Sequence, residues 1–523
     1  MPSGKPERAS SSWIGFLLPS IADLLFVALL FGLSFGALGR VLLRDADIGW
    51  HIRNGQMILA SHAIPRTDPF SSIKAGDTWY AWEWLYDVVI ATIHQVAGLN
   101  GVVFFSAAII AAAFVLALQV SLKRGGNLVV TFALLILSLA ASAVHFLARP
   151  HVLTWLFAVI WFVLLDAAAT RRTDRRVFWL PALMILWVNV HGGFVLGFAM
   201  LGIYLMGGAI EWVAHPAERR ETARWITRLG VVTAFTVAAS FVNPYGYHLH
   251  AHVYHYLTDR FLMSQISEFL SPDFHGAAQQ CFAALLIVTI VSLASAREKL
   301  GPSRLLLLLF AAYSGLYATR NLPTSSLLMS LLIAPLLSNS MRNANENSAI
   351  VPRLRGGLAR ISSFGARMQS VERNFRGHAW IVLALVAGCW ACLHDGRLGR
   401  TQLIHAQFDA KRFPVQAADY IAEQNIAGPI FSLDYWGGYL IYRLYPETKV
   451  VLDDRHDFYG DQIIKDYLNI VTVQPTYQKE LDAMHVDWVL LPRWSSLANI
   501  LRLNSAWKSV YEDGTAALFR RRP

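Results

Sequence analysis

Long apolar stretches recur along most of the chain, separated by short polar or basic connections. A helix of roughly 20 apolar residues spans a bilayer, and shorter apolar helices are tolerated inside a protein. The first stretch is long and lacks a convincing signal-peptide cleavage site, so we interpret it as an anchor. On this basis the sequence predicts eleven membrane spans, at residues 15–39, 101–121, 128–146, 151–170, 177–190, 193–213, 226–242, 279–296, 303–319, 323–338 and 378–395.

The basic residues between these stretches predict the orientation in the membrane, because cytoplasmic loops carry an excess of Lys and Arg. With eleven crossings, all strongly basic connections fall on one side, namely Lys5 with Arg8, 123–124, 171–176, 219–228, 297–304 and 340–376. We therefore expect a cytoplasmic N-terminal tail, 1–14, and a flexible cytoplasmic linker, 340–376. The C-terminus then lies outside a bacterial inner membrane.

A large first external loop is predicted for residues 40–100. Within this loop, 82–97 has an amphipathic pattern. Counting it as a crossing would place the basic connection 171–176 on the wrong side of the membrane. We therefore predict a helix that lies along the membrane interface.

The last part of the chain, 396–523, has a different pattern. Apolar runs of strand length occur at 428–433, 449–452 and 487–491, and helical patterns occur at 415–425, 436–444, 461–471 and 476–484. Alternating strands and helices are typical of a small α/β domain. The sequence thus predicts a polytopic α-helical membrane domain, 15–395, followed by a soluble periplasmic α/β domain, 396–523.

The composition agrees with this class: 55% of the residues are hydrophobic and only 15% are charged, against roughly 25% charged in an ordinary soluble domain. The net charge of +10 does not indicate nucleic-acid binding, because the basic residues follow the topology and contact anionic lipids. Cys281, Cys389 and Cys392 all lie in apolar stretches without further ligands nearby. We interpret them as packing residues.

Two carboxylates, Asp45 and Asp47, follow the first predicted span directly and precede Trp50. Carboxylates at this spacing can share a divalent cation, or one can act as a base that the other orients. Mg²⁺ and Mn²⁺ prefer such oxygen ligands and usually bind substrate phosphate oxygens as well. The alternative is an ordinary helix cap or a partner for Arg44. Their place just outside a first membrane helix favours a catalytic or metal-binding pair.

Other polar residues of the first loop leave alternatives open. His51 and Arg53 could hold a phosphate, since Arg offers two parallel donors and His a switchable one; contact with lipid headgroups is the competing interpretation. Glu83 and Asp87 are one helical turn apart on one face. They could form a second metal or acid/base group, or they could lie on a solvated face. Asp68, before a proline, is predicted to form a turn.

Several cationic or titratable side chains are predicted at span ends on the outer side. They are Arg149, His151, His191, His248 and Arg320. A single arginine in such a place is common, because its side chain reaches back to the interface. Five such groups on one side would form a cationic rim suited to a phosphorylated or pyrophosphorylated substrate.

Two further polar groups have two interpretations each. The second external stretch, 243–278, is rich in His and Tyr; it either binds a metal or, as we favour, anchors an interfacial helix in the aromatic belt. The tail carries a set that forms either a binding face or the usual polar loops at strand ends, namely Asp434, Asp453, Asp454, Arg455 and His456.

Together these features resemble the C-type glycosyltransferase superfamily, which includes oligosaccharyltransferases, protein O-mannosyltransferases and aminoarabinose transferases. Its members are similar in their cytoplasmic N-terminus, large first external loop with an early acidic motif, and frequent external C-terminal domain. The strings that carry the resemblance to a bacterial branch are Asp45-Ala-Asp-Ile-Gly-Trp-His51, Ile64-Pro-Arg-Thr-Asp-Pro-Phe70, Glu83-Trp-Leu85, Trp436-Gly-Gly-Tyr-Leu440 and Asp453-Asp-Arg455. The resemblance covers nearly the whole chain.

The resemblance implies glycosyl transfer from a polyprenyl-phosphate sugar to an envelope glycan, lipid or protein, at the outer face. Asp45 or Asp47 would be the base or the Mg²⁺ or Mn²⁺ ligand, and the rim Arg and His would hold the donor phosphate. The oligosaccharyltransferase tail motif Trp-Trp-Asp-Tyr-Gly is only distantly matched by Asp434-Tyr-Trp-Gly-Gly438. That departure leaves recognition of a peptide acceptor unsupported.

Two other functions compete with this one. A transporter or flippase of a lipid-linked or anionic solute would need charges at mid-membrane depth and often shows repeated halves, and the sequence has few such charges and no evident repeat. A non-catalytic envelope assembly protein would use the tail as a binding face. An enzyme requires Asp45 or Asp47 to face Arg149, His191 and Arg320 across one outward cavity.

Overall fold

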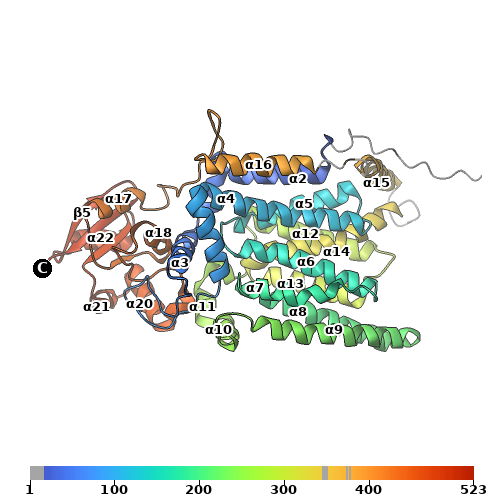
Figure 1. The fold of residues 1–523 in the computed structure, drawn as a ribbon, viewed down its shortest axis with the longest axis horizontal. Helices are drawn as coiled ribbons and strands as arrows, with labels where there is room; N and C mark the ends of the chain where they lie inside the picture. The colour runs from blue at the N-terminus through green and yellow to red at the C-terminus, as the bar shows by residue number, and fades with distance from the viewer. Residues whose placement is uncertain (1–16, 344–351, 373–374, 376–377) are drawn as a thin grey trace, which may run out of the picture.

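The computed structural model describes residues 17–343, 352–372, 375 and 378–523, and the predicted cytoplasmic tail 1–14 lies outside this range. Figure 1 shows a bundle of roughly parallel helices with a smaller mixed domain at one end, built from the C-terminal part of the chain. Helix α3 (Asp47–Ser61) lies between the two. We call the C-terminal part, residues 396–523, the tail domain.

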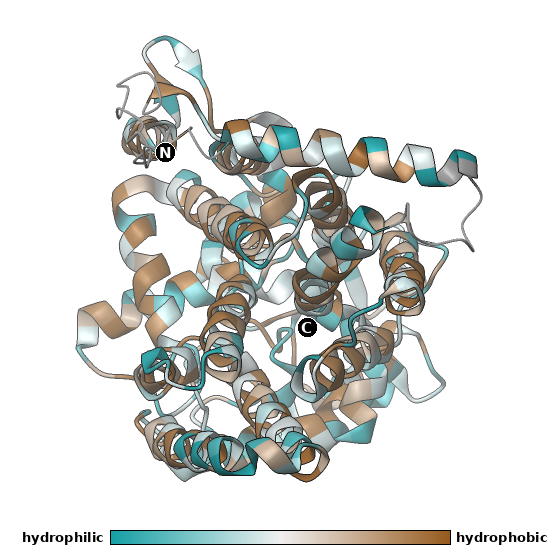
Figure 2. Cartoon of the chain, turned by 90° about the vertical axis from the view of Figure 1, so that its right-hand side faces the viewer, coloured by the Kyte–Doolittle hydropathy of each residue, from teal (hydrophilic) through white to brown (hydrophobic). Residues whose placement is uncertain are grey.

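The bundle contains a helix at each of the eleven predicted spans. These are α2 (Ile21–Ser34), α4 (Trp84–Lys123), α5 (Leu128–Ser142), α6 (His151–Thr170), α7 (Leu180–Val188), α8 (Val195–Ala214), α9 (Arg219–Ser240), α12 (Ala277–Ser295), α13 (Pro302–Tyr317), α14 (Leu322–Arg342) and α16 (Ala379–Leu393). Viewed along the bundle, most of these helices are hydrophobic (Figure 2).

Among the described residues, six helical segments are long and apolar enough to cross a membrane, by length and composition: Trp84–Lys123, Leu128–His145, His151–Thr170, Gly192–Ala214, Ala277–Ser295 and Thr319–Arg342. Three shorter apolar helices accompany them. The prediction of a polytopic α-helical membrane fold is therefore confirmed. The number of eleven crossings stays a prediction.

Two predicted boundaries differ from the structure. Helix α2 is shorter than the stretch 15–39, because Ser20 caps its start and Gly36, at φ +60°, ends it; a 3₁₀ helix, η1 (Gly36–Leu43), follows. The predicted helix over 82–97 exists, but it is joined directly to the next span as the first arm of α4. Gly98, with φ 56° and ψ −157°, makes the break between the two arms, a conformation that glycine adopts at little cost.

The segment 340–376, predicted to be a flexible linker, is helical over much of its described part. It contains helix α15 (Pro352–Glu372), which is fixed to the end of the bundle. Asn127, the N-cap of α5, donates from its amide to the carbonyl of Ser362 at 2.9 Å. Gly365 lies against the same amide, so that a Cβ there would meet Asn127 Oδ1 at 2.0 Å. The basic composition that suggested a linker instead belongs to a docked helix.

Short helices connect the bundle on the side of the tail domain and at its far end. They are η2 (Ala143–His145), η3 (Arg176–Trp179), η4 (Gly192–Phe194), η5 (Pro216–Glu218), α10 (Tyr247–Thr258), α11 (Arg260–Gln265), η6 (Ser267–Phe269) and η7 (Thr319–Asn321). Of these, η2, η4, η6 and η7 carry or adjoin the polar residues of the candidate site.

The tail domain is a small α/β unit, as predicted. A mixed sheet has the order β3-β4-β6-β5, in which β3 pairs in parallel with β4 and the other neighbours are antiparallel. Its elements are β3 (Ile430–Ser432), β4 (Trp488–Pro492), β5 (Trp507–Glu512), β6 (Ala516–Arg521), α17 (Val415–Glu423), α18 (Asp434–Leu444), α19 (His456–Tyr459), α20 (Asp461–Val471), α21 (Tyr477–Ala483) and α22 (Ser496–Leu503). A short hairpin of β1 (Arg397–Leu398) and β2 (Thr401–Gln402) precedes them.

The predicted strand over 449–452 is not a strand of this sheet. Val450 instead makes single parallel bridges on both sides, to Ile430 of β3 and to Ser71 of the first external loop. Pairing ends after this residue, so no ladder forms. The segment thereby joins the tail domain to the loop that follows α3.

Close backbone contacts also join the tail domain to α3. A Cβ on Gly438 of α18 would lie 2.4 Å from the carbonyl oxygen of Ala46, and one on Gly49 would lie 2.2 Å from the carbonyl oxygen of Gly438. Only glycine allows the two helices to approach so closely. This contact brings the tail residues 453–457 beside the acidic pair that precedes α3.

Candidate functional site

A cavity of about 460 Å³ lies where the bundle, the first external loop and the tail domain meet. Its charged and titratable lining residues are Asp47, Glu83, His145, Arg149, His151, His191, Glu268, Arg320, Asp454, Arg455 and Asp457. Asp47, Glu83, Arg149, His151, His191 and Arg320 were candidates from the sequence. The structure therefore brings Asp47, Arg149, His191 and Arg320 to one cavity, the arrangement that an enzyme requires.

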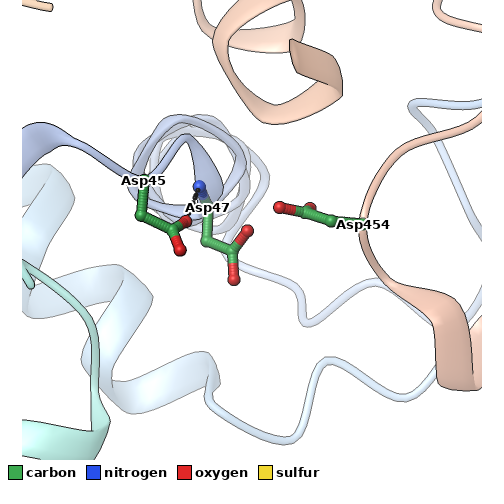
Figure 3. A group of neighbouring side chains, drawn as sticks. All are labelled: Asp45, Asp47 and Asp454. Atoms are coloured by element: carbon green, nitrogen blue, oxygen red, sulfur yellow. Dashed lines mark hydrogen bonds between the residues drawn. The ribbon is translucent and has the colours of Figure 1, made fainter. Parts of the chain in front are cut away.

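Three carboxylates form an acidic cluster at the edge of this cavity: Asp45, Asp47 and Asp454. One carboxylate oxygen of each lies within 4.8 Å of the others. Figure 3 shows the Asp454 side chain extending from the tail domain toward Asp47. Asp47 also donates its backbone N–H to Asp45 Oδ1 at 3.0 Å. The cluster thus combines a motif of two neighbouring residues with a residue some 400 positions away in the sequence.

The acidic cluster holds more negative charge than its protein partners neutralise. Asp47 Oδ1 and Asp454 Oδ1 are buried and have no hydrogen-bond partner among the described residues. Burial, with the nearby Asp45, raises the pKa of Asp47 to about 7, and burial with the nearby Asp47 raises the pKa of Asp454 well above its usual range. Unsatisfied buried oxygens with raised pKa values indicate a place for an added cation or donor.

Arg149, directly before α6, is the protein cation of this cluster. Its guanidinium pairs with Asp45 at 3.2 Å (Nη1 to Oδ2) and with Asp47 through the other terminal nitrogen. Burial would lower the pKa of Arg149, but the carboxylates of Asp47 and Asp45 outweigh it and hold the pKa well above its usual value. One guanidinium therefore fixes both carboxylates while the third, Asp454, faces them from the tail domain.

A second polar group lies on the other side of the cavity, around Glu268 of η6. Arg320 Nη1 lies 3.5 Å from Glu268 Oε1, and His145 Nε2 lies 3.2 Å from Glu268 Oε2. His151 places its Nε2 2.9 Å from the carbonyl oxygen of His145. Arg320 also covers the ring of Phe269 at 4.3 Å. This group presents one arginine and two histidines around a single carboxylate.

The negative charge of Glu268 is expected to stabilise the folded protein. Burial would raise the pKa of Glu268, but Arg320, His145 and Arg149 hold it well below the usual value. A carboxyl whose pKa is lowered on folding stabilises the fold above its unfolded pKa of about 4.3, and loses that contribution as the pH falls below it. We expect Glu268→Gln to destabilise the protein by about 1–3 kcal/mol at pH 7.

The difference in melting temperature between wild type and Glu268→Gln in detergent should then narrow as the pH is lowered from 5 to 3, below the unfolded pKa of the group. Glu423→Gln, an exposed tail position, is the matched control and should change little at any pH. A difference that stays constant from pH 5 to pH 3 would show that the charge of Glu268 does not stabilise the fold.

His51, Glu83 and Asp87 form a buried array behind the acidic cluster. His51 Nδ1 lies 2.6 Å from Asp87 Oδ1, and Asp87 Oδ2 accepts from the side-chain amide of Asn54 at 2.6 Å. Glu83 lies between two rings, with its oxygens 3.7 Å from His51 Nε2 and 3.7 Å from His191 Nε2. Of the array, Glu83 lines the cavity, and so does the neighbouring His191. His51 is 1% exposed.

Two residues predicted for phosphate binding are thus not at the cavity surface. His51 faces Asp87, as described. Arg53 points to the tail domain, where its guanidinium donates to the carbonyl of Tyr442 at 2.9 Å (Nε) and 2.6 Å (Nη2). Arg53 therefore holds α18 against α3. Neither residue is part of the phosphate site proposed below.

Asp68 forms the predicted turn, accepting from the backbone N–H of Ser71 at 2.9 Å, and it has a second role. Its other oxygen lies 2.9 Å from Arg455 Nη1 of the tail domain. Arg455 is buried, pairs with Asp453 at 2.8 Å (Nε to Oδ1) and lies over the ring of Trp79 at 4.7 Å. Arg455 therefore connects the tail domain to the first external loop.

The sequence did not single out His145, Glu268 or Asp457 for the site, and it left Asp454 and Arg455 with two interpretations. His145 and Glu268 lie in short 3₁₀ turns without a motif. Asp457 pairs with His252 of the second external stretch at 2.9 Å. His248 of that stretch, expected at the rim, is exposed and does not line the cavity. The sequence signal for Asp454 was the run Asp453-Asp454-Arg455, which does not indicate that Asp454 lies beside Asp45 and Asp47 in the fold.

Apolar side chains also line the cavity. They are Val195, Leu196, Ala199, Val253, Leu257, Met263 and Phe310. These residues come from α8, α10, α11 and α13. Several neighbouring side chains of α13, among them Leu309, Tyr313 and Tyr317, are exposed on the bundle surface. The cavity is thus polar at the tail domain and apolar toward the bundle.

No family model and no curated protein matches the chain. Solved structures do. The archaeal oligosaccharyltransferase AglB from Archaeoglobus fulgidus, in complex with an inhibitory peptide and a dolichol-phosphate, matches with a TM-score of 0.56 and 10% identity, covering 96% of this chain and 73% of that one. This chain and the matched structure therefore share a fold.

The oligosaccharyltransferase of the same organism in the apo form matches with a TM-score of 0.52 and 10% identity, over 90% of this chain and 69% of that one. ArnT from Cupriavidus metallidurans, bound to undecaprenyl phosphate, has a TM-score of 0.46 and 13% identity, over 95% and 96%. The likeness to the two oligosaccharyltransferase structures shows that this chain shares their fold. At these identities the likeness establishes the fold and leaves the activity to the site itself.

Proposed function

We propose that this multi-pass membrane protein is a glycosyltransferase that moves a sugar from a polyprenyl-phosphate donor to an acceptor on the tail-domain side of the membrane. One observation carries the proposal. A single cavity is lined by cationic side chains, by apolar side chains and by Asp47 and Asp454 of the acidic cluster. A lipid-linked sugar phosphate needs all three.

The donor fits the cavity by chemistry. The apolar side chains of α8, α10, α11 and α13 offer the groove that a polyprenyl chain requires, and Arg320 offers N–H donors for its phosphate. The ring N–H groups of neutral His151 and His191 instead face the carbonyl of His145 and the carboxyl of Glu83. Arginine binds phosphate through two parallel N–H groups. In the matching oligosaccharyltransferase structure the bound lipid is a dolichol-phosphate, which is a molecule of this class.

The acidic cluster fits a divalent cation. Asp45, Asp47 and Asp454 present only oxygen ligands, and two of these oxygens are buried without a partner; Mg²⁺ and Mn²⁺ prefer such ligands. A bound cation would act as a Lewis acid that neutralises the leaving phosphate. Arg149 keeps Asp45 and Asp47 in place and offers a fixed positive charge beside the same phosphate.

The reaction follows from these groups. The acceptor attacks the anomeric carbon, the bond to the phosphate oxygen breaks, and Arg149 and Arg320 stabilise the negative charge that develops on the phosphate. A carboxylate of the external loop takes the acceptor proton. Because no covalent intermediate with the protein is involved, we expect inversion at the anomeric carbon.

The test is release of undecaprenyl phosphate by the purified full-length protein in detergent, with an extract of bacterial envelope lipids and glycans as the source of acceptor. The donors are undecaprenyl phosphate linked to glucose, mannose, galactose or an amino sugar, with Mn²⁺ or EDTA. We expect turnover of one donor, inhibition by EDTA, and a KM for the donor that rises about 10- to 100-fold in Arg320→Gln. Arg66→Gln, an exposed arginine that donates to the carbonyl of Pro244 outside the cavity, should match wild type.

Turnover without any effect of Arg320→Gln would place the phosphate elsewhere. If wild type binds a donor but never releases undecaprenyl phosphate, the glycosyltransferase proposal is wrong. Transfer of the intact lipid between leaflets of proteoliposomes would then indicate a flippase, and its absence would indicate an assembly protein.

A further inference from the structure

Glu83 occupies an unusual position between two histidine rings. It precedes α4, and two hydrogen bonds hold this end of the helix to the turn before His191. Trp84 Nε1 donates to Asn189 Oδ1 at 2.7 Å, and the Leu85 N–H donates to the carbonyl of Asn189 at 3.2 Å. Glu83 consequently faces His191 on one side and His51 of α3 on the other.

The hydrogen bonds of His191 determine which of its nitrogens carries the proton. The backbone N–H of Gly193 donates to His191 Nδ1 at 3.0 Å, so Nδ1 is an acceptor. Thr154 Oγ1 lies 2.8 Å from the same nitrogen and itself accepts from Trp187 Nε1 at 3.0 Å. Neutral His191 therefore carries its proton on Nε2, the nitrogen that faces Glu83.

His51 has the opposite arrangement. The Asp87 carboxylate, fixed by the amide of Asn54, accepts from His51 Nδ1 at 2.6 Å. An acidic partner on Nδ1 keeps the proton there and leaves Nε2 as an acceptor, and this Nε2 faces Glu83 at 3.7 Å. Gly55 permits this contact, since a Cβ there would lie 2.0 Å from the Asp87 carbonyl oxygen.

Glu83 thus has a donor ring on one oxygen and an acceptor ring on the other. We propose that Glu83 is the base for the acceptor hydroxyl, with His51, Asp87 and His191 as positioning residues. This inference rests on the proposed function and assigns the proton path within it. The gaps of 3.7 Å are about 1 Å longer than a hydrogen bond, and such distances commonly shorten when substrate binds.

The step balances as follows. The acceptor oxygen forms a bond to the anomeric carbon, and the bond between that carbon and the phosphate oxygen breaks with its electron pair going to the phosphate. The acceptor proton moves to Glu83. The released lipid phosphate carries the additional negative charge, and the proton leaves Glu83 through the cavity when the products leave.

Glu83 suits this role better than the acidic cluster does. The Asp47 carboxylate is occupied by Arg149, whereas the neighbours of Glu83 on both sides can exchange protons. Burial and the nearby Asp87 raise the pKa of Glu83 well above its usual value, so Glu83 holds the proton once it has received it. The other charged groups that act on it are Arg149, Asp47 and Asp457.

The tautomers test the array without a substrate. In ¹⁵N-histidine spectra of the full-length protein in lipid nanodiscs at pH 7, we expect the proton of His51 on Nδ1 and that of His191 on Nε2. The signals are assigned from His51→Gln and His191→Gln. The same tautomer for both rings, or an imidazolium in either, would overturn the proposal.

Kinetics test the role of the array in transfer. With the donor that turns over fastest in the panel above, His51→Gln and Asp87→Asn should each lower kcat about tenfold or more and leave the KM for the donor unchanged. His94→Gln is the matched control, because this histidine of the same α4 bonds to Tyr442 outside the cavity. Unchanged kcat in both variants would overturn the role of His51 and Asp87 as positioning residues. Absence of turnover in wild type would refute the proposed function instead, and the tautomers would still decide the array.

Discussion

Asp454→Asn is expected to lower the turnover of a lipid-linked donor by about 100-fold or more, although this residue lies in the tail domain and not in the membrane bundle. Removing one group that stabilises charge in the transition state costs a factor of this size. The variant keeps the shape of the side chain and removes one of the three carboxyl groups that could hold a cation, leaving Asp45 and Asp47. The protein should remain folded, because burial already raises the pKa of Asp454 well above its usual range.

The measurement is kcat and the Mn²⁺ concentration for half-maximal rate, in wild type and variant after treatment with EDTA. A cation ligand predicts that the variant needs more Mn²⁺. Asp487→Asn removes an exposed tail carboxylate and serves as the control. Wild-type kcat and Mn²⁺ dependence in Asp454→Asn would show that the tail domain adds no ligand to the site.

Arg455→Met is expected to have the largest effect on stability. The guanidinium is 5% exposed and lies between Asp453 and Asp68, two carboxylates that are themselves buried. Removing one partner of a buried ion pair leaves uncompensated charge and costs about 3–5 kcal/mol. Since Asp68 belongs to the first external loop, the loss should also loosen the contact between the tail domain and the bundle.

We would measure the melting temperature in detergent and the rate of limited trypsin cleavage near the start of the tail domain. Arg502→Met removes a more exposed tail arginine that pairs with Glu512 at 3.0 Å, and such pairs contribute at most about 1 kcal/mol. Adding Asp68→Asn to Arg455→Met should recover part of the stability. Equal, small effects of the two arginine variants would mean that the buried pair does not hold the tail domain.

The sequence predicted the bundle well because a bilayer imposes a length and a composition on each spanning helix. All eleven apolar stretches correspond to helices, and the acidic motif and outer-side cations were visible because charges are costly near a membrane. Arg149, expected at the rim, pairs with both Asp45 and Asp47. Opposite charges at the same end of neighbouring helices attract each other in this way.

What the sequence could not predict depends on contacts between distant segments. Nothing near Asp454 indicates that α18 approaches α3 through Gly438 and Gly49, so its place beside Asp47 was not visible. The same holds for Arg53, whose partner is a backbone carbonyl of the tail domain. Helix α15 was missed because its basic composition resembles a cytoplasmic loop, whereas its contacts with the bundle come from distant segments. Asn127 donates to the carbonyl of Ser362, and Glu372 accepts from the backbone N–H of Ile21.

The docking of the tail domain has a consequence for how the protein matures during synthesis. Asp454 and the Val450 segment that bridges Ser71 are synthesised some 400 residues after Asp45 and Asp47. Until then the cavity lacks one wall and the acidic cluster lacks its third carboxylate. A nascent chain whose bundle is already inserted therefore has no complete candidate site until the tail domain is made and docks against α3.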